Sequence, residues 1–174
     1  MEEEIINKVS QSSLYTIDLE QFFPTENIRI FDLKPFLFME LILKEKDFRA
    51  SLLSTDWSVY KDEIVGVYCS ADAVIPVWAY MLVTSYLQPF AKEVIMGSEM
   101  EVLRQLITKK IQAVNPAEYA DKRIVVKGCG DRPVGDFAYL EITKLLRPVV
   151  KSIMYGEPCS TVPIYKAQSL KPKA

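Results

Sequence analysis

The chain has 174 residues, of which 49% are hydrophobic and 25% are charged, as in an ordinary water-soluble globular protein. Its net charge of -2 gives no electrostatic reason to bind nucleic acid. Its acidic first residues and short apolar stretches predict neither a signal peptide nor a membrane-spanning helix, so we expect a cytoplasmic protein with reduced thiols. The chain has no histidine, which excludes Ser-His-Asp triads, Cys-His dyads within one chain and HExxH zinc sites.

The N-terminal third predicts short elements. A helix over residues 2–11 precedes two strands, Leu14–Leu19 and Ile28–Leu33, which are separated by a turn. The continuous apolar run Phe36–Leu43 predicts a further strand, because it is too short for a typical buried helix. Residues Glu45–Leu53 then predict a helix.

An internal repeat occupies most of the remaining chain. Residues 79–97 align with residues 138–156 at an offset of 59, and 7 of 19 positions are identical, where chance predicts about one. The identical pairs are Ala79/Ala138, Tyr80/Tyr139, Thr84/Thr143, Leu87/Leu146, Pro89/Pro148, Lys92/Lys151 and Gly97/Gly156. The chain therefore holds two related copies, over residues 62–97 and 121–156.

Each copy predicts a strand, a helix and a second strand. The predicted elements are Ile64–Tyr68, Pro76–Gln88 and Val94–Met96 in the first copy and Ile124–Lys127, Asp136–Arg147 and Ser152–Tyr155 in the second. Between the copies, Ser98 and Glu101 form a capping box that begins another helix. We therefore predict one α/β domain over residues 1–163: a mainly parallel sheet built from two repeated β-α-β units, with the N-terminal strands added at one edge. Residues 164–174 are expected to form a loose tail.

Three cysteines follow predicted strands. Ligands in open α/β sheets bind beyond the carboxyl ends of the strands, so Cys69, Cys129 and Cys159 would meet at one edge of a single parallel sheet. Three thiolates suit zinc or an iron–sulfur cluster. The fourth ligand would be Asp131, Asp72 or Glu157, or a water or substrate molecule in an open site. The alternative is that the cysteines are small buried hydrophobes.

A glycine-rich loop, Gly128–Gly135, lies between a predicted strand and a predicted helix. Backbone N–H groups around Gly128 and Gly130, with Arg132, could bind an anion, and Cys129 would then be the catalytic thiolate of an enzyme or a sulfur carrier. The alternative is a tight turn whose glycines supply positive φ angles.

The predicted helix over residues 76–88 is apolar nearly all round. Such a helix is buried on both sides, either by its own domain or by a second subunit. Besides a metal-binding protein and a thiolate enzyme, the sequence thus allows a third hypothesis for the function. The protein would be a non-catalytic interaction module that forms a homodimer through helix 76–88, and its thiols would be inert.

Several segments resemble a family of small bacterial proteins defined only as a domain of unknown function. They are Leu43–Arg49, Cys69–Ala73, Leu87–Lys92, Lys127–Asp131 and Ser152–Pro163. The resemblance covers almost the whole chain and implies a stand-alone cytosolic protein with no established activity, so no catalytic residue is carried over. It also implies an association with iron–sulfur assembly proteins as partners, which favours the metal or cluster reading. The leading hypothesis is thus an accessory factor in iron–sulfur biogenesis.

Overall fold

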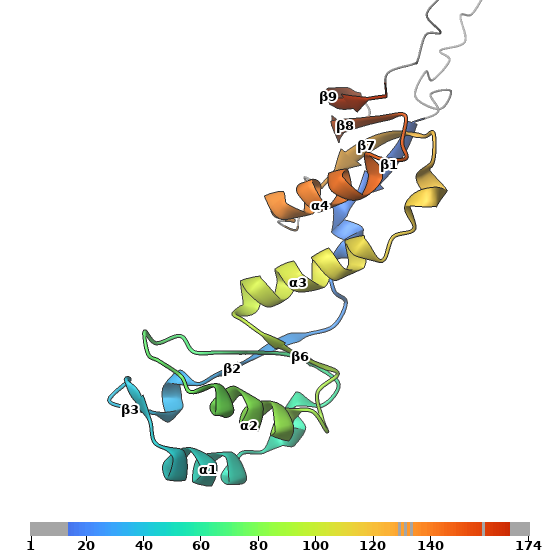
Figure 1. Ribbon diagram of the computed structural model, residues 1–174. Helices are drawn as coiled ribbons and strands as arrows, with labels where there is room; N and C mark the ends of the chain where they lie inside the picture. The colour runs from blue at the N-terminus through green and yellow to red at the C-terminus, as the bar shows by residue number, and fades with distance from the viewer. Residues whose placement is uncertain (1–13, 129, 131, 133, 158, 168–174) are drawn as a thin grey trace, which may run out of the picture. The chain divides into compact units, whose positions relative to one another are not determined.

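The computed structural model describes residues 14–128, 130, 132, 134–157 and 159–167, so the expected helix over residues 2–11 lies outside the described residues. The described chain is a mixed α/β structure with four α-helices and mostly parallel strands (Figure 1). It divides into two compact units, which we call unit 1 (Met1–Phe23 and Ile107–Ala174) and unit 2 (Pro24–Leu106). No helix among the described residues is both long and apolar enough to cross a membrane.

Unit 2 is built on a three-stranded parallel sheet. Its strands are β2 (Ile28–Asp32), β5 (Ile64–Tyr68) and β6 (Glu93–Met96), in the order β2-β5-β6. Strand β5 is buried on both faces, which explains why its sequence is β-branched throughout except for one glycine and one tyrosine.

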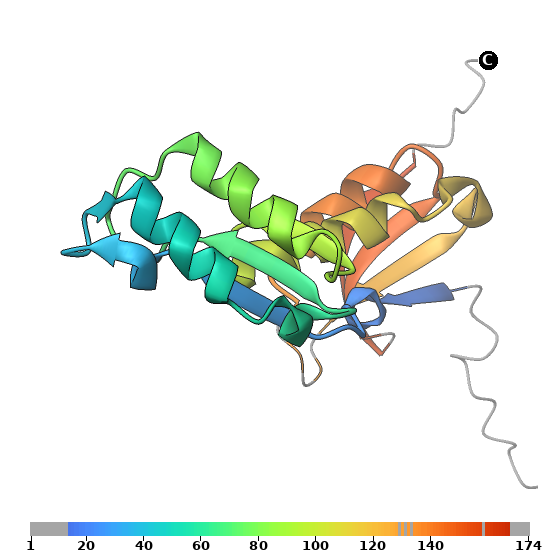
Figure 2. The same ribbon diagram turned by 90° about the horizontal axis from the view of Figure 1, so that it is seen from below.

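Helices cover both faces of the unit 2 sheet. Helices α1 (Glu45–Ser54) and α2 (Val77–Leu87) lie on the same face, where they bury an aromatic-rich core (Figures 1 and 2). On the opposite face, Val102 and Leu106 of α3 (Glu99–Gln112) pack with Ile64 and Ile95. Helix α3 begins at the predicted capping box, where the Ser98 N–H donates to Glu101 Oε2 at 2.8 Å.

Unit 1 has a four-stranded sheet in the order β1-β7-β8-β9. Strands β1 (Leu14–Asp18), β7 (Arg123–Lys127) and β8 (Ser152–Glu157) are parallel, and β9 (Ser160–Lys166) is antiparallel to β8. Helix α4 (Asp136–Leu146) connects β7 to β8 and buries Ala138, Ile142 and Leu146. The described chain also contains short 3₁₀ helices at Leu19–Phe22, Lys34–Phe36, Trp57–Tyr60 and Pro116–Tyr119.

The two repeat copies lie in different sheets. Equivalent elements of the two copies begin 59 residues apart, so the sequence repeat is also a repeat of secondary structure. The equivalent pairs are β5 and β7, α2 and α4, and β6 and β8. The prediction of one sheet built from both copies is therefore wrong. The prediction that the N-terminal strands add to one edge of that sheet is also wrong, because β1 pairs with β7 and β2 pairs with β5. The apolar patterns of the strands do not say which strands pair, since both sheets bury both faces.

The copies diverge after an equivalent glycine. Gly97 directly follows β6, Gly156 lies one residue before the end of β8, and both have positive φ angles, 142° and 114°, which glycine tolerates. The chain leaves Gly97 into α3, whereas it turns after Gly156 into β9. As a result β8 has a neighbour on its outer side, and β6 has none among the described residues.

Two other predicted segments differ from the structure. The run Phe36–Leu43 is not one strand but two two-residue strands, β3 (Leu37–Phe38) and β4 (Ile42–Leu43), joined by a turn in which Met39 and Glu40 have positive φ. Its apolar side chains are largely exposed, so length and hydrophobicity misled the prediction. The predicted tail begins inside a strand, because β9 continues through Lys166.

Equivalent core positions should have similar effects on stability. Leu87 and Leu146 are both fully buried at the same position of the two copies, and each leucine-to-alanine change should lower the free energy of unfolding by about 2–5 kcal/mol through lost burial and a cavity. Urea unfolding followed by circular dichroism measures this. Leu53→Ala, at a side chain that is 74% exposed, is the control and should change stability by less than about 0.5 kcal/mol. Equal effects of all three variants would contradict the described core.

Candidate functional site

The carboxyl ends of the unit 2 strands are tied together by Asp32. Its carboxylate accepts hydrogen bonds from the backbone N–H of Lys34 at 2.9 Å and from the backbone N–H and hydroxyl of Ser70 at 3.0 and 2.5 Å. Burial by itself would raise the pKa of Asp32, but these hydrogen bonds together hold it below the usual value. The carboxylate thus fixes the chain where it leaves β2 and β5.

Unit 1 has an aspartate at the matching position, Asp18, at the end of β1. Its carboxylate accepts from the backbone N–H of Glu20 at 3.0 Å and pairs with Lys127 Nζ at 3.2 Å. The hydrogen bond and charge of Asp18, with a smaller contribution from Glu157, raise the pKa of Lys127. These partly exposed ion pairs contribute little stability, so the cluster mainly orients side chains at this end of the sheet.

The two aspartates carry a sequence signal that the repeat search missed. Each stands between a buried apolar residue and a fully buried leucine, in Ile17-Asp18-Leu19 and Phe31-Asp32-Leu33. Strands β1 and β2 also pair with their repeat copies in the same register, Leu14 with Arg123 and Ile28 with Ile64. The repeated structural unit therefore includes one strand from the N-terminal region.

The predicted cysteine site is not assembled among the described residues. Cys69 lies in unit 2, where it packs against the core, and Cys159 is exposed in the turn between β8 and β9 of unit 1. Cys129 and Asp131 lie outside the described residues. Within the described part of the chain, no group of three Cys, Asp or Glu side chains could hold a metal ion. The metal ion or iron–sulfur cluster, the role in iron–sulfur biogenesis and the thiolate enzyme stay predictions.

The glycines of the proposed anion loop are explained by close packing. A Cβ atom at Gly128 would lie 2.7 Å from Tyr139 Oη, and a Cβ at Gly130 would overlap the carboxylate of Glu20. A carboxylate beside the loop repels an anion, and Arg132 lies over the ring of Phe23, 5.6 Å from its centroid. Close approach of Tyr139 and Glu20 therefore accounts for glycine at positions 128 and 130, whereas Gly135 of the same loop has the positive φ angle, 75°, that the tight-turn alternative predicts. Anion binding by the loop stays a prediction.

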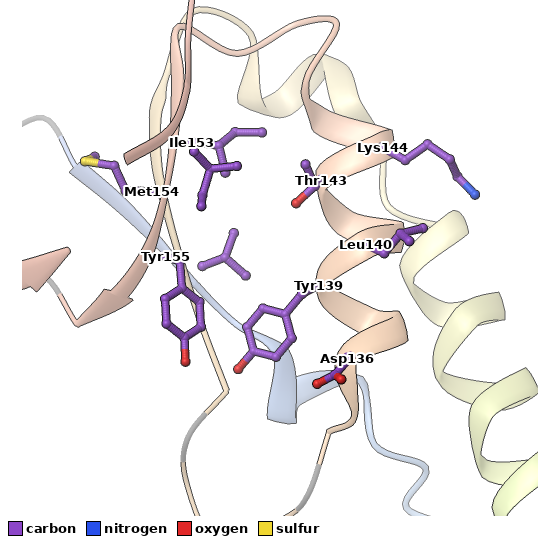
Figure 3. Close-up of a pocket in the computed structure, with 10 residues that line it drawn as sticks. Asp136, Tyr139, Leu140, Thr143, Lys144, Ile153, Met154 and Tyr155 are labelled. Carbon is purple, nitrogen blue, oxygen red and sulfur yellow. The ribbon is translucent and has the colours of Figure 1, made fainter. Parts of the chain in front are cut away.

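The structure shows a groove in unit 1 that the sequence did not predict. It has a volume of about 730 Å³ and lies between α4 and strands β7 and β8, with one residue from β9 (Figure 3). The lining residues are Val126, Asp136, Tyr139, Leu140, Thr143, Lys144, Ile153, Met154, Tyr155 and Ile164. The rings of Tyr139 and Tyr155 meet edge to face at 5.5 Å, and with Asp136 they form the polar end of the groove.

Unit 2 has the equivalent groove, between α2 and β6, with a volume of about 900 Å³. Its lining residues match those of unit 1 at the repeat offset: Val67/Val126, Val77/Asp136, Tyr80/Tyr139, Met81/Leu140, Thr84/Thr143, Val94/Ile153 and Met96/Tyr155. Burial raises the pKa of Tyr80, and the negative charge of a Cys69 thiolate adds to the rise. The grooves share their middle positions and differ at one end, where unit 1 has a carboxylate and a phenol and unit 2 has two apolar side chains.

Cysteine accessibility tests the metal prediction. Cys159 is exposed and Cys69 is half-buried, so Cys159 should react with a thiol reagent such as DTNB several-fold faster than Cys69. Rates are measured on Cys69→Ser and Cys159→Ser variants to assign each phase. Protection of Cys69 and Cys159 together by one equivalent of zinc would support a shared metal site, and zinc that protects neither thiol would count against it.

Titration of Asp32 tests its role at the strand ends. Because its pKa is depressed in the folded state, Asp32 stabilises the fold at pH values above the unfolded pKa of about 4, and this contribution is lost as the pH falls through the folded pKa. The difference in unfolding free energy between wild type and Asp32→Asn should therefore shrink between pH 6 and pH 3 in urea unfolding experiments. A difference that stays constant over this range would show that the charge of Asp32 has no such role.

Comparison with known proteins identifies the family and no activity. The family model described as "Protein of unknown function (DUF2480)" matches residues 3–167. Neither the search of curated proteins nor the search of solved structures gave a match. Since the matched region covers nearly the entire chain, the protein belongs to the DUF2480 family.

Proposed function

We propose that this protein is a binding protein whose unit 1 groove holds a mainly apolar small molecule with a hydrogen-bond donor at one end. The observation that carries the proposal is the recurrence of the same groove in both repeat copies. Of the seven matched lining positions, three are identical, including the half-buried Tyr139 and Thr143. Tyrosine and threonine at these positions are not needed to fill a dry core, so their presence in both copies supports a role in binding.

The walls of the groove favour an apolar ligand. The lining surface is mostly apolar and includes Val126, Leu140, Ile153, Met154 and Ile164. Binding sites for small molecules are typically apolar with a few placed polar groups. The groove lies between a helix and the strands it covers, so a flat or elongated molecule would be held on two sides.

The polar end of the groove favours a donor over an anion. Asp136, Tyr139 and Tyr155 lie together at the end near the carboxyl ends of β7 and β8, where ligands of α/β sheets commonly bind (Figure 3). Lys144 is the basic residue of the lining set, but it points away from the groove and pairs with Glu141 at 2.6 Å. Among the described lining residues no cation faces the Asp136 carboxylate, which therefore repels an anionic head group and accepts a hydrogen bond from an amine or hydroxyl.

Fluorescence titration with 1-aminoanthracene, an apolar probe with one amine donor, tests the proposal. Leu140→Glu places a charge in the groove at a side chain that is 63% exposed, so it should weaken binding at least tenfold without unfolding the protein. Ile164→Glu is the second variant and should act in the same direction. Leu53→Glu, on α1 and outside both grooves, is the matched control and should bind like wild type.

The head group is tested separately with anthracene-1-carboxylate. This probe should bind at least tenfold more weakly than the amine, and Asp136→Asn should narrow that difference. Equal affinity of wild type and both groove variants for the amine would overturn the proposal, as would stronger binding of the carboxylate.

A second candidate function, the interaction module through helix 76–88, is favoured by one observation. Helix α2 contains no charged residue, and Val77 and Met81 lie exposed on it, although its other side packs in the core of unit 2. This candidate concerns unit 2 and is independent of ligand binding in unit 1.

A further inference from the structure

We infer that the open edge of strand β6 pairs with the β6 strand of a second copy of this chain, forming a two-fold antiparallel sheet that closes the unit 2 groove. The inference starts from two neighbouring features of unit 2: the outer edge of β6 has no pairing strand among the described residues, and the helix beside it, α2, has an apolar exposed face without charged residues. The internal repeat then indicates what kind of element belongs there.

The repeat gives a direct comparison of the two edges. In unit 1, β8 pairs with the antiparallel strand β9, and Ile164 of β9 lines the groove beside α4. In unit 2, the equivalent strand β6 pairs only with β5 among the described residues. The outer edge of the second strand is therefore covered in unit 1 by an antiparallel strand, β9, which places an apolar side chain over the groove. Unit 2 has no such strand among the described residues.

The β6 edge has free pairing capacity. Gly97 N–H donates to Val67 O at 3.0 Å, toward β5, so by alternation along the strand the N–H and carbonyl of Val94 face the open side. The Met96 carbonyl already accepts from Gln105 Nε2 at 3.1 Å, which limits new pairing to the start and middle of the strand. Unpaired edges of this kind are templates for strand addition.

Exposed apolar side chains surround this edge. Val77 and Met81 of α2 are 74% and 69% exposed, and Met96 of β6 is 67% exposed. At the equivalent positions unit 1 has Asp136, Leu140 and Tyr155, so the copy whose edge is covered by its own chain carries the charged side chain. The copy with the open edge has replaced it by valine, a change that favours burial in a protein interface.

A second copy is the occupant that fits the charges. A two-fold axis makes the same patch face itself, which requires a surface without like-charge contacts. Helix α2 meets this requirement because it has no charged residue. In antiparallel pairing about a two-fold axis at Val94, Glu93 lies opposite Ile95 of the other copy and not opposite its own equivalent.

Light scattering coupled to size-exclusion chromatography of the full chain, together with sedimentation equilibrium, tests the inference. The wild type should be a dimer at micromolar concentration. Met81→Glu and Met96→Lys each bury a charge in the interface and should raise the dimer dissociation constant by roughly 100-fold. Leu53→Glu, also an exposed leucine on a unit 2 helix, should remain dimeric.

Two further results separate this inference from the proposed ligand site. Leu140→Glu, at the position equivalent to Met81 in unit 1, should lose the probe and remain dimeric. Hydrogen exchange at the Val94 amide should slow as protein concentration rises. A wild type that stays monomeric up to 100 µM, or a dimer that persists in both folded interface variants, would overturn the inference. Circular dichroism of each variant establishes that it is folded.

Discussion

Each unit depends on a strand that comes from outside its repeat copy. A β-α-β unit by itself gives only two strands, and two strands with one helix cannot cover a core. Strands β1 and β2 complete the sheets by pairing in parallel with β7 and β5, in the same register. The aspartate at the end of each added strand then fixes the following turn, so the strand ends, the grooves and the loops after β5 and β7 are all positioned by this pairing.

Local sequence patterns predicted most of the helices and strands, but they did not predict which strands pair with one another. The strands Ile64–Tyr68 and Arg123–Lys127 and the helices α1 to α4 agree with their β-branched runs, prolines and capping residues to within about two residues. Strand β9, which contains Pro163, was not predicted, and its last residues were assigned to the tail over residues 164–174. An outer strand tolerates proline, and the register of β8 with β9 is irregular close to it.

The cysteine prediction depended on one assumption about topology. It assumed that strands of both copies share one sheet, which would align Cys69 with Cys159, and the two residues belong to different units. Nothing in the strand sequences distinguishes one sheet from two, because a buried parallel strand has the same apolar pattern in either case. The grooves could have been found from sequence, by asking which repeat pairs retain a polar residue, such as Tyr80/Tyr139 and Thr84/Thr143.

The order of the units along the chain has a consequence for synthesis. Unit 2 is one continuous stretch, Pro24–Leu106, inserted between β1 and the rest of unit 1. As the chain leaves the ribosome, every strand of the β2-β5-β6 sheet is available before β7 exists. Strand β1 emerges first, but its partner β7 is made only after the whole of unit 2. The three-stranded sheet of unit 2 can therefore form during synthesis while β1 still has no strand to pair with, and a chain stopped between Leu106 and β7 would hold one complete sheet and one unpaired strand.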